Sequence, residues 1–169
     1  MGKKVLTTEQ IRRIEKRTMQ ALDIKSWALM ERAATALKDW IVGRFRLDQV
    51  VFFIVAGPGN NGGDGLALAR LLYDLDADVA ISLWSEKSSF SSDNKRNQEL
   101  ARELGIPFLD SDELYSWLSK QKKAVIGIDA LFGIGFNGAM RAYYRPAVEI
   151  LNDRRHISEV LSVDMPGGM

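Results

Sequence analysis

From residue 50 onward, short apolar runs alternate with helical segments. The runs are continuously hydrophobic, which is typical of parallel strands buried on both faces, and their alternation with helices indicates parallel βαβ crossovers. We therefore predict an α/β fold with a doubly wound, mainly parallel sheet and helices on both faces, in three layers. The strand candidates are "VVFFIVA" (50–56), "DVAISLW" (78–84), "IPFLD" (106–110), "AVIGID" (124–129) and "VLSVDM" (160–165). The helical segments lie near residues 65–75, 92–104, 111–120 and 143–152.

Two helices are expected ahead of the first strand. Thr7 and Gln10 have the spacing of a capping box, in which two side chains satisfy N–H groups at the start of a helix. Ser26 then precedes apolar residues that recur with a helical period up to Ile41. The sequence therefore predicts two N-terminal helices in front of the sheet.

Length and charge limit the class of protein. The chain has 169 residues, enough for one domain, residues 1–169, whose core needs no disulfide. Its 23 Lys and Arg residues nearly balance 22 Asp and Glu residues, so the charge predicts neither a nucleic-acid partner nor a membrane surface. The absence of cysteine excludes thiolate chemistry and fits a reducing compartment. With no apolar run near the start that could serve as a signal or membrane segment, a cytoplasmic protein is expected.

Three of the strand candidates run into unusual loops. These are "GPGNNGGDG" (57–65), "DALFGIGFNG" (129–138) and "DMPGG" (164–168). If the five strands have the usual order 3-2-1-4-5, the three loops lie at one edge of the sheet, where ligands of such folds bind. Residues 57–62 also fit the pattern G-x-G-x-x-G between a strand and a helix, where backbone amides can hold a phosphate.

An acidic residue lies in each of these loops: Asp64, Asp129 and Asp164. Three carboxylates converging on an anionic ligand would repel it unless a cation or a proton intervenes. The loops offer oxygen ligands and no His or Cys, which disfavours zinc, copper and iron. Neutral oxygens outnumber carboxylates there, so a weakly charged ion is at least as suitable as magnesium or calcium. Any one of these residues alone could instead be a helix cap or a turn former.

The catalytic possibilities are narrowed by what the chain lacks. His156 is the only histidine, and it lies in a polar connector away from the glycine-rich loops. A Ser-His-Asp device is therefore not expected. Acid–base chemistry must fall to Asp, Glu, Lys or Tyr, and an Asp at a strand end beside glycines is a suitable proton donor or acceptor.

Four segments together resemble the NAD(P)H-hydrate epimerase family, also called the YjeF N-terminal domain family: "LMERAA" (29–34), "GPGNNGGDGLALAR" (57–70), "DALFGIGFNG" (129–138) and "SVDMPGG" (162–168). The resemblance implies a Rossmann-like domain that interconverts the R and S epimers of hydrated NADH or NADPH at C6 of the nicotinamide ring, as part of cofactor repair. It also implies a homodimer and a partner ATP- or ADP-dependent dehydratase. Because family members continue beyond the last motif, we expect residues 1–169 to be a single domain truncated at its C-terminus.

The resemblance also assigns roles to individual residues. It implies that Asp164 is catalytic and that Asn61, Asp129 and Gly167 hold a potassium ion, although the family usually has Ser at the position of Gly167. At Ile134 the family commonly has Thr. The substrate-binding residues implied are Asn60, Asn61, Gly62, Gly63, Asp64, Gly133, Ile134, Gly135, Phe136, Asn137, Gly138, Ala139 and Asp164.

Two other functions remain open at this point. Related domains serve as binding modules in mRNA-decapping scaffolds and in an apolipoprotein A-I binding protein, but the retained Asn61, Asp64, Asp129 and Asp164 favour catalysis. A nicotinamide dehydrogenase is supported by the glycine pattern and by Glu86, which follows the second strand, yet no evident partner for hydride transfer accompanies them. The sequence shows no preference between the hydrates of NADH and NADPH.

Overall fold

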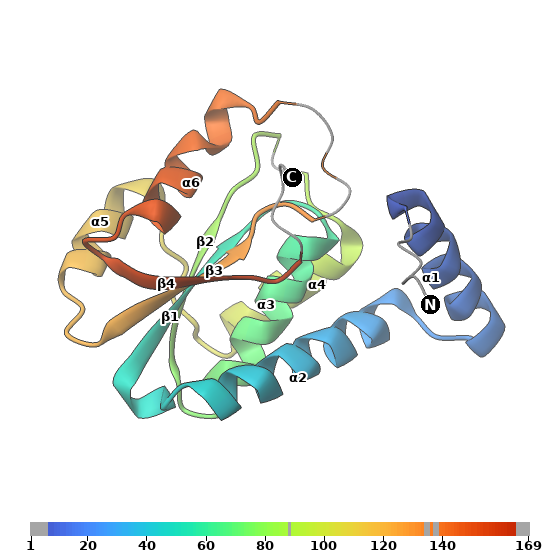
Figure 1. The fold of residues 1–169 in the computed structure, drawn as a ribbon, viewed down its shortest axis with the longest axis horizontal. Coiled ribbons are helices and arrows are strands. Elements are labelled where there is room, and N and C mark those ends of the chain that lie inside the picture. The colour runs from blue at the N-terminus through green and yellow to red at the C-terminus, as the bar shows by residue number, and fades with distance from the viewer. Residues whose placement is uncertain (1–6, 88, 134–135, 137–138, 165–169) are drawn as a thin grey trace, which may run out of the picture.

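The computed structural model describes residues 7–87, 89–133, 136 and 139–164 (Figure 1). Two helices, α1 (Thr8–Leu22) and α2 (Ser26–Arg44), precede the first strand, as predicted. The capping box of α1 is present: Gln10 N–H donates to Thr7 Oγ1 at 3.3 Å, and Thr7 N–H donates to Gln10 Oε1 at 2.9 Å. The local spacing in the sequence was therefore sufficient to place the start of α1.

The described residues of the remaining chain form a four-stranded sheet whose strands are all parallel, in the order β2-β1-β3-β4. This is the predicted order for four of the five strand candidates. The elements are the short 3₁₀ turn η1 (Leu47–Gln49), β1 (Val50–Ala56), α3 (Asn60–Tyr73), β2 (Asp78–Leu83), α4 (Ser92–Glu103), α5 (Ser111–Ser119), β3 (Ala124–Ala130), η2 (Ala142–Tyr144), α6 (Arg145–Asn152) and β4 (Ile157–Ser162). No helix in the described ranges is long and apolar enough to cross a membrane.

Strand β1 lies at the centre of the fold and is buried along its whole length. Its side chains alternate between two cores: Phe52 and Ile54 pack with residues of α2, α3 and α4, whereas Val51 and Phe53 pack with residues of α5 and α6. Helices therefore cover both faces of the sheet (Figure 1). This three-layer arrangement confirms the predicted doubly wound α/β fold.

Residues 106–110 were predicted as a strand, and this is wrong. Phe108 makes only an isolated parallel bridge to Ile81, with Ile81 N–H donating to the Pro107 carbonyl at 2.9 Å and Leu109 N–H donating to the Ile81 carbonyl at 2.8 Å. Proline has no N–H to donate to a ladder, which limits pairing here. The segment nevertheless lies beside β2, where the order 3-2-1-4-5 puts it.

Two boundaries near the glycine-rich edge also differ from the prediction. Helix α3 begins at Asn60 rather than near residue 65, so most of the predicted loop is the first turns of a helix. Strand β4 spans Ile157–Ser162 rather than 160–165, and Asp164 therefore lies two residues beyond its end. Glycine disfavours helix interiors, which is why the sequence alone pointed to a loop at residues 60–65.

Candidate functional site

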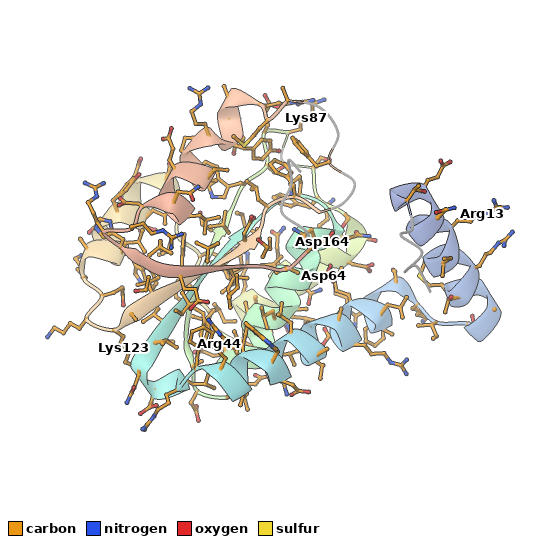
Figure 2. The ribbon with its side chains drawn as sticks, in the orientation of Figure 1. Arg13, Arg44, Asp64, Lys87, Lys123 and Asp164 are labelled. Atoms are coloured by element: carbon orange, nitrogen blue, oxygen red, sulfur yellow. The ribbon has the colours of Figure 1, made fainter. Side chains whose placement is uncertain are left out.

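The carboxyl ends of β1, β3 and β4 lie at one edge of the sheet, because all three strands are parallel and β3 pairs with both of the others. The glycine-rich segment after β1, the segment after β3 and Asp164 after β4 therefore share this edge, as the sequence predicted. Figure 2 shows Asp64 near the start of α3 and Asp164 beyond the end of β4 on this side of the molecule. This edge is the place where a doubly wound sheet binds ligands.

At Gly57, the turn between β1 and α3 is packed against the chain at the end of β3, with no room for a side chain. Gly57 N–H donates to the Ala130 carbonyl at 3.0 Å. A Cβ atom on Gly57 would lie 1.8 Å from the Leu131 carbonyl oxygen, far inside contact distance. Gly57 is therefore required by the close approach of two backbones, whether or not a ligand is bound.

The start of α3 lies at this edge and has no side-chain cap. Its N-cap is Gly59, which has no side chain to accept a hydrogen bond from the first turn. The N–H groups of Asn60, Asn61 and Gly62 have no acceptor within the helix, as in the first turn of any α-helix. They also lie at the positive end of the helix dipole. Such a terminus is suited to hold a phosphate, which agrees with the role expected for residues 60–64.

Gly133 brings together two side chains from different elements. A Cβ atom on Gly133 would lie 2.7 Å from Asp164 Oδ2 and 3.2 Å from Asn61 Cβ. Asn61 on α3 and Asp164 after β4 therefore both lie against the backbone of residue 133, in the segment that follows β3. Three residues to which the family resemblance assigned substrate contacts thus meet at one point.

Asn61 has the features expected of a ligand for a cation. Its side chain is only 9% exposed, and neither Oδ1 nor Nδ2 has a hydrogen-bond partner among the described residues. Buried amides without partners are rare in folded proteins and call for an occupant such as an ion or a bound molecule. The side chain of Asn61 therefore fits the cation that the sequence predicted.

Asp129 is the last residue but one of β3. Its Oδ1 accepts a hydrogen bond from Leu131 N–H at 3.1 Å. Burial raises the pKa of the Asp129 carboxyl, and this hydrogen bond only partly opposes the shift. A cation beside the carboxylate would favour its ionised form and reverse the effect of burial.

Asp64, Asp129 and Asp164 do not by themselves form a metal site. Within the described parts of the chain, no three His, Cys, Asp or Glu side chains form a group that could hold a metal ion. The donors near the edge are mainly neutral oxygens, because the loops that meet there are built largely from glycine and asparagine. Such a set suits a weakly charged cation better than zinc or another transition metal.

Five predicted site residues lie outside the described residues, namely Ile134, Gly135, Asn137, Gly138 and Gly167. Of the second expected substrate segment, the structure describes Gly133, Phe136 and Ala139. Phe136 stacks on Phe132 with ring centroids 4.2 Å apart, and Phe132 meets the edge of Tyr144 at 4.8 Å. This aromatic packing fixes the base of the segment after β3.

Glu86 and His156 both contact charged residues of this chain. Glu86 forms an ion pair with Arg141, so the carboxylate that a dehydrogenase would use for ribose is already engaged. His156 precedes the first residue of β4, at the opposite end of the strand from Asp164, and its Nδ1 lies 3.2 Å from Asp153 Oδ2. The ion pair of Glu86 weakens the dehydrogenase hypothesis.

Comparison with known proteins decides the family. The family described as YjeF-related protein N-terminus matches residues 26–169. This chain belongs to that family. The NAD(P)H-hydrate epimerase of Limosilactobacillus reuteri is 34% identical over 169 residues, covering 100% of this chain and 76% of the relative. That of Oenococcus oeni is 30% identical over 165 residues, covering 97% of this chain and 74% of the relative.

Two further YjeF relatives extend the comparison. The bifunctional NAD(P)H-hydrate repair enzyme Nnr of Thermofilum pendens is 32% identical over 168 residues, which cover 98% of this chain but only 32% of that enzyme. The crystal structure of the yeast protein YNL200c matches with a TM-score of 0.80 and 30% identity, covering 98% of this chain and 72% of the yeast chain. The fold is therefore that of the YjeF family.

One contributor to this YjeF site was missed by sequence reasoning. Residues 85–98 were interpreted only as a polar loop that enters a helix, yet α4 binds the turn that leads into α3. Ser91 N–H donates to the Pro58 carbonyl at 3.0 Å, and Asn94 Nδ2 donates to the Gly57 carbonyl at 2.9 Å. The spacing of Ser91 and Asn94 identifies a helix cap, which is present, but no sequence signal pointed from Asn94 to the turn.

Proposed function

We propose that this chain interconverts the R and S forms of hydrated NADH and NADPH at C6 of the nicotinamide ring. The observation that carries the proposal is the meeting of Asn61 and Asp164 at Gly133, beside the uncapped start of α3. This arrangement puts an acid–base group next to a site suited to a pyrophosphate. The names of the relatives from L. reuteri and O. oeni, both NAD(P)H-hydrate epimerase, support it.

In this proposal the two ends of the substrate are held by different elements. The N–H groups of residues 60–64 bind the phosphates, and the segment from Gly133 to Ala139 holds the nicotinamide side. Asp164 gives a proton to the C6 hydroxyl, which leaves as water, and takes one back from the water that adds to the opposite face. No net oxidation occurs. Holding the phosphates at a distance leaves both faces of one carbon open to reaction, as inversion at C6 requires.

We also propose that a potassium ion is held by Asn61, Asp129 and Gly167. The buried and unpartnered amide of Asn61 and the raised pKa of Asp129 support a cation here. When bound, such an ion supplies a single positive charge beside the substrate phosphates. Asn61 and Asp129 would direct their oxygens at it, which satisfies two groups that burial otherwise penalises.

The direct test supplies purified R epimer of hydrated NADH and follows the appearance of the S epimer by chromatography, with potassium and with choline as the replacement cation. The proposal predicts conversion that is faster with potassium. No conversion under either condition, in protein shown by circular dichroism to be folded, would favour a binding module of the same fold.

We further propose a cytoplasmic homodimer that works with an ATP- or ADP-dependent dehydratase. The bifunctional repair enzyme of T. pendens, of which a chain like this one makes up about a third, supports a functional link to a second repair activity. Adding a dehydratase specific for the S epimer to a mixture of both epimers tests the link. With this chain present, the whole mixture should return to NADH, and without it only the S form should. Sedimentation of the purified chain tests the dimer.

A further inference from the structure

The turn between β1 and α3 is hydrogen-bonded to one helix, α4. The carbonyls of three consecutive residues, Gly57, Pro58 and Gly59, all accept hydrogen bonds from the N-cap and the first turn of α4. Asn94 Nδ2 donates to Gly57 at 2.9 Å and to Gly59 at 3.0 Å, and Ser91 N–H donates to Pro58 at 3.0 Å. The directions of three adjacent peptide groups are therefore set by α4.

The side chain of Asn94 is buried and fully hydrogen-bonded. Its side chain is 0% exposed, and both of its amide hydrogens are used on the turn. Gln98 Nε2 donates to Asn94 Oδ1 at 2.8 Å, which fixes the orientation of the amide so that its NH₂ group faces the turn. A fully satisfied buried amide is rigid, because each alternative orientation would leave polar atoms without partners.

The glycines of the segment fit around this amide. A Cβ atom on Gly62 would lie 1.9 Å from the Gly57 carbonyl oxygen and 2.8 Å from Asn94 Nδ2. A Cβ atom on Gly63 would lie 2.7 Å from Met30 Cε on α2 and 3.4 Å, an ordinary contact distance, from the Asn94 backbone nitrogen. Gly62 is thus required by the Gly57 carbonyl and by the Asn94 amide together, whereas Gly63 is required by Met30.

We infer that Asn94 is a positioning residue for phosphate binding. By holding the Gly59 carbonyl toward α4, it turns the N–H of Asn60, which lies on the opposite side of the same peptide group, toward the edge where the substrate lies. It does not touch the substrate itself. This inference rests on the proposed function only for the identity of the substrate, because the anion site is formed by the peptide groups of this chain.

Asn97 provides a matched control. It lies on the same helix, is 2% exposed, and makes as many contacts, but they go elsewhere: its Nδ2 donates to Met30 Sδ at 3.2 Å and to the Asp93 carbonyl at 3.1 Å, and its Oδ1 accepts from Arg70 at 2.6 Å. Asn97→Ala and Asn94→Ala should therefore destabilise the fold to a similar degree. Only Asn94→Ala should also disturb the turn between β1 and α3.

The experiment measures the Kd of ADP-ribose by calorimetry and the KM and kcat for hydrated NADH, in the wild-type chain and in both variants. We expect Asn94→Ala to raise Kd and KM about tenfold, the effect of one to two lost hydrogen bonds, with kcat changed less than about twofold. Asn97→Ala should change neither Kd nor KM. Equal Kd values in the two variants would overturn the inference.

A milder variant covers the case in which Asn94→Ala does not fold. Gln98→Ala removes the group that orients the Asn94 amide and should raise the Kd of ADP-ribose about threefold, in line with one lost hydrogen bond. An unchanged Kd in this variant would also overturn the inference. If the wild-type chain binds ADP-ribose in an Asn94-dependent manner but converts no epimer, the proposed function fails and the positioning role of Asn94 stands.

Discussion

Asp164 Oδ2 lies directly against the backbone of Gly133, so that a Cβ atom at residue 133 would come within 2.7 Å of it. The two residues follow different strands, β3 and β4, and meet only because those strands are neighbours in the sheet. The position of the proposed catalytic carboxylate therefore depends on the absence of a side chain at residue 133.

Gly133→Ala should displace this carboxylate. We expect kcat for epimer interconversion to fall about a hundredfold, the cost of a displacement on the order of 1 Å in a catalytic group. Gly43→Ala is the control, because nothing lies within 4 Å of a Cβ atom there and the residue is on an exposed part of α2. That variant should keep its kcat and gain about 1 kcal/mol of stability from helix propensity. Equal kcat values in the two variants would contradict the account of Gly133.

Gly57 and Gly59 are two residues apart and should respond very differently to alanine. A Cβ atom on Gly57 would meet the Leu131 carbonyl at 1.8 Å, whereas one on Gly59 would have nothing within 4 Å. We expect Gly57→Ala to lose about 3 kcal/mol of unfolding free energy, since backbone must move to admit the methyl group. Gly59→Ala should lose less than about 1 kcal/mol, the usual effect at a helix N-cap. Urea unfolding of both variants measures the difference, and similar losses would show that the backbones are not packed as described.

The sequence predicted part of the fold around these glycines and not the start of α3. The strand β1, the helix cap at Thr7 and the meeting of three loops at one edge follow from local pattern and from parallel topology, and the structure confirms them. The start of α3 at Asn60 could not be predicted in the same way. Glycines at 62, 63 and 65 disfavour a helix, and only their neighbours in space, such as Ala130 against Gly65, explain why the helix is formed there.

The hydrogen bonds from α4 to the turn could not be predicted either, because they join residues far apart in the sequence. A single Asn in a polar segment is most often a surface residue or a cap, and nothing in the sequence relates residue 94 to residues 57 and 59. The strand predicted at 106–110 failed because hydrophobicity does not show whether partners for a ladder are present. The donor set of Asn61 and Asp129 was predicted from resemblance, and the burial of both groups is new information from the structure.

Asp129→Asn should separate the effects of burial and of the cation. Because the pKa of Asp129 is raised in the folded chain, the unfolded chain releases this proton first as pH rises from the ordinary value of 3.8. The free energy of unfolding therefore falls as pH rises from the unfolded-state pKa to the raised folded-state pKa. Above that pH, and so at neutral pH, the loss remains. Without potassium, Asp129→Asn should therefore have a higher Tm than the wild-type chain at pH 7, since the variant carries no buried charge. At pH 3 the two Tm values should converge.

Adding potassium should reverse that order. An ion that binds only the folded wild-type chain stabilises it by about 1.4 kcal/mol at ten times its Kd, and the variant without the carboxylate should show little of this gain. Thermal unfolding with potassium or choline chloride at equal ionic strength measures the effect. The same potassium response in both chains would remove Asp129 from the ion site.

The central claim is that Asp164 moves the proton during inversion at C6, and Asp164→Asn tests it most directly. The measurement is the rate at which purified R epimer of hydrated NADH becomes S epimer, together with the Kd of ADP-ribose and the Tm of the same preparation. The account predicts a rate at least about a hundredfold lower, as is usual when an acid–base group is removed, with Kd and Tm nearly unchanged. A variant that converts the epimers at the wild-type rate would contradict the account.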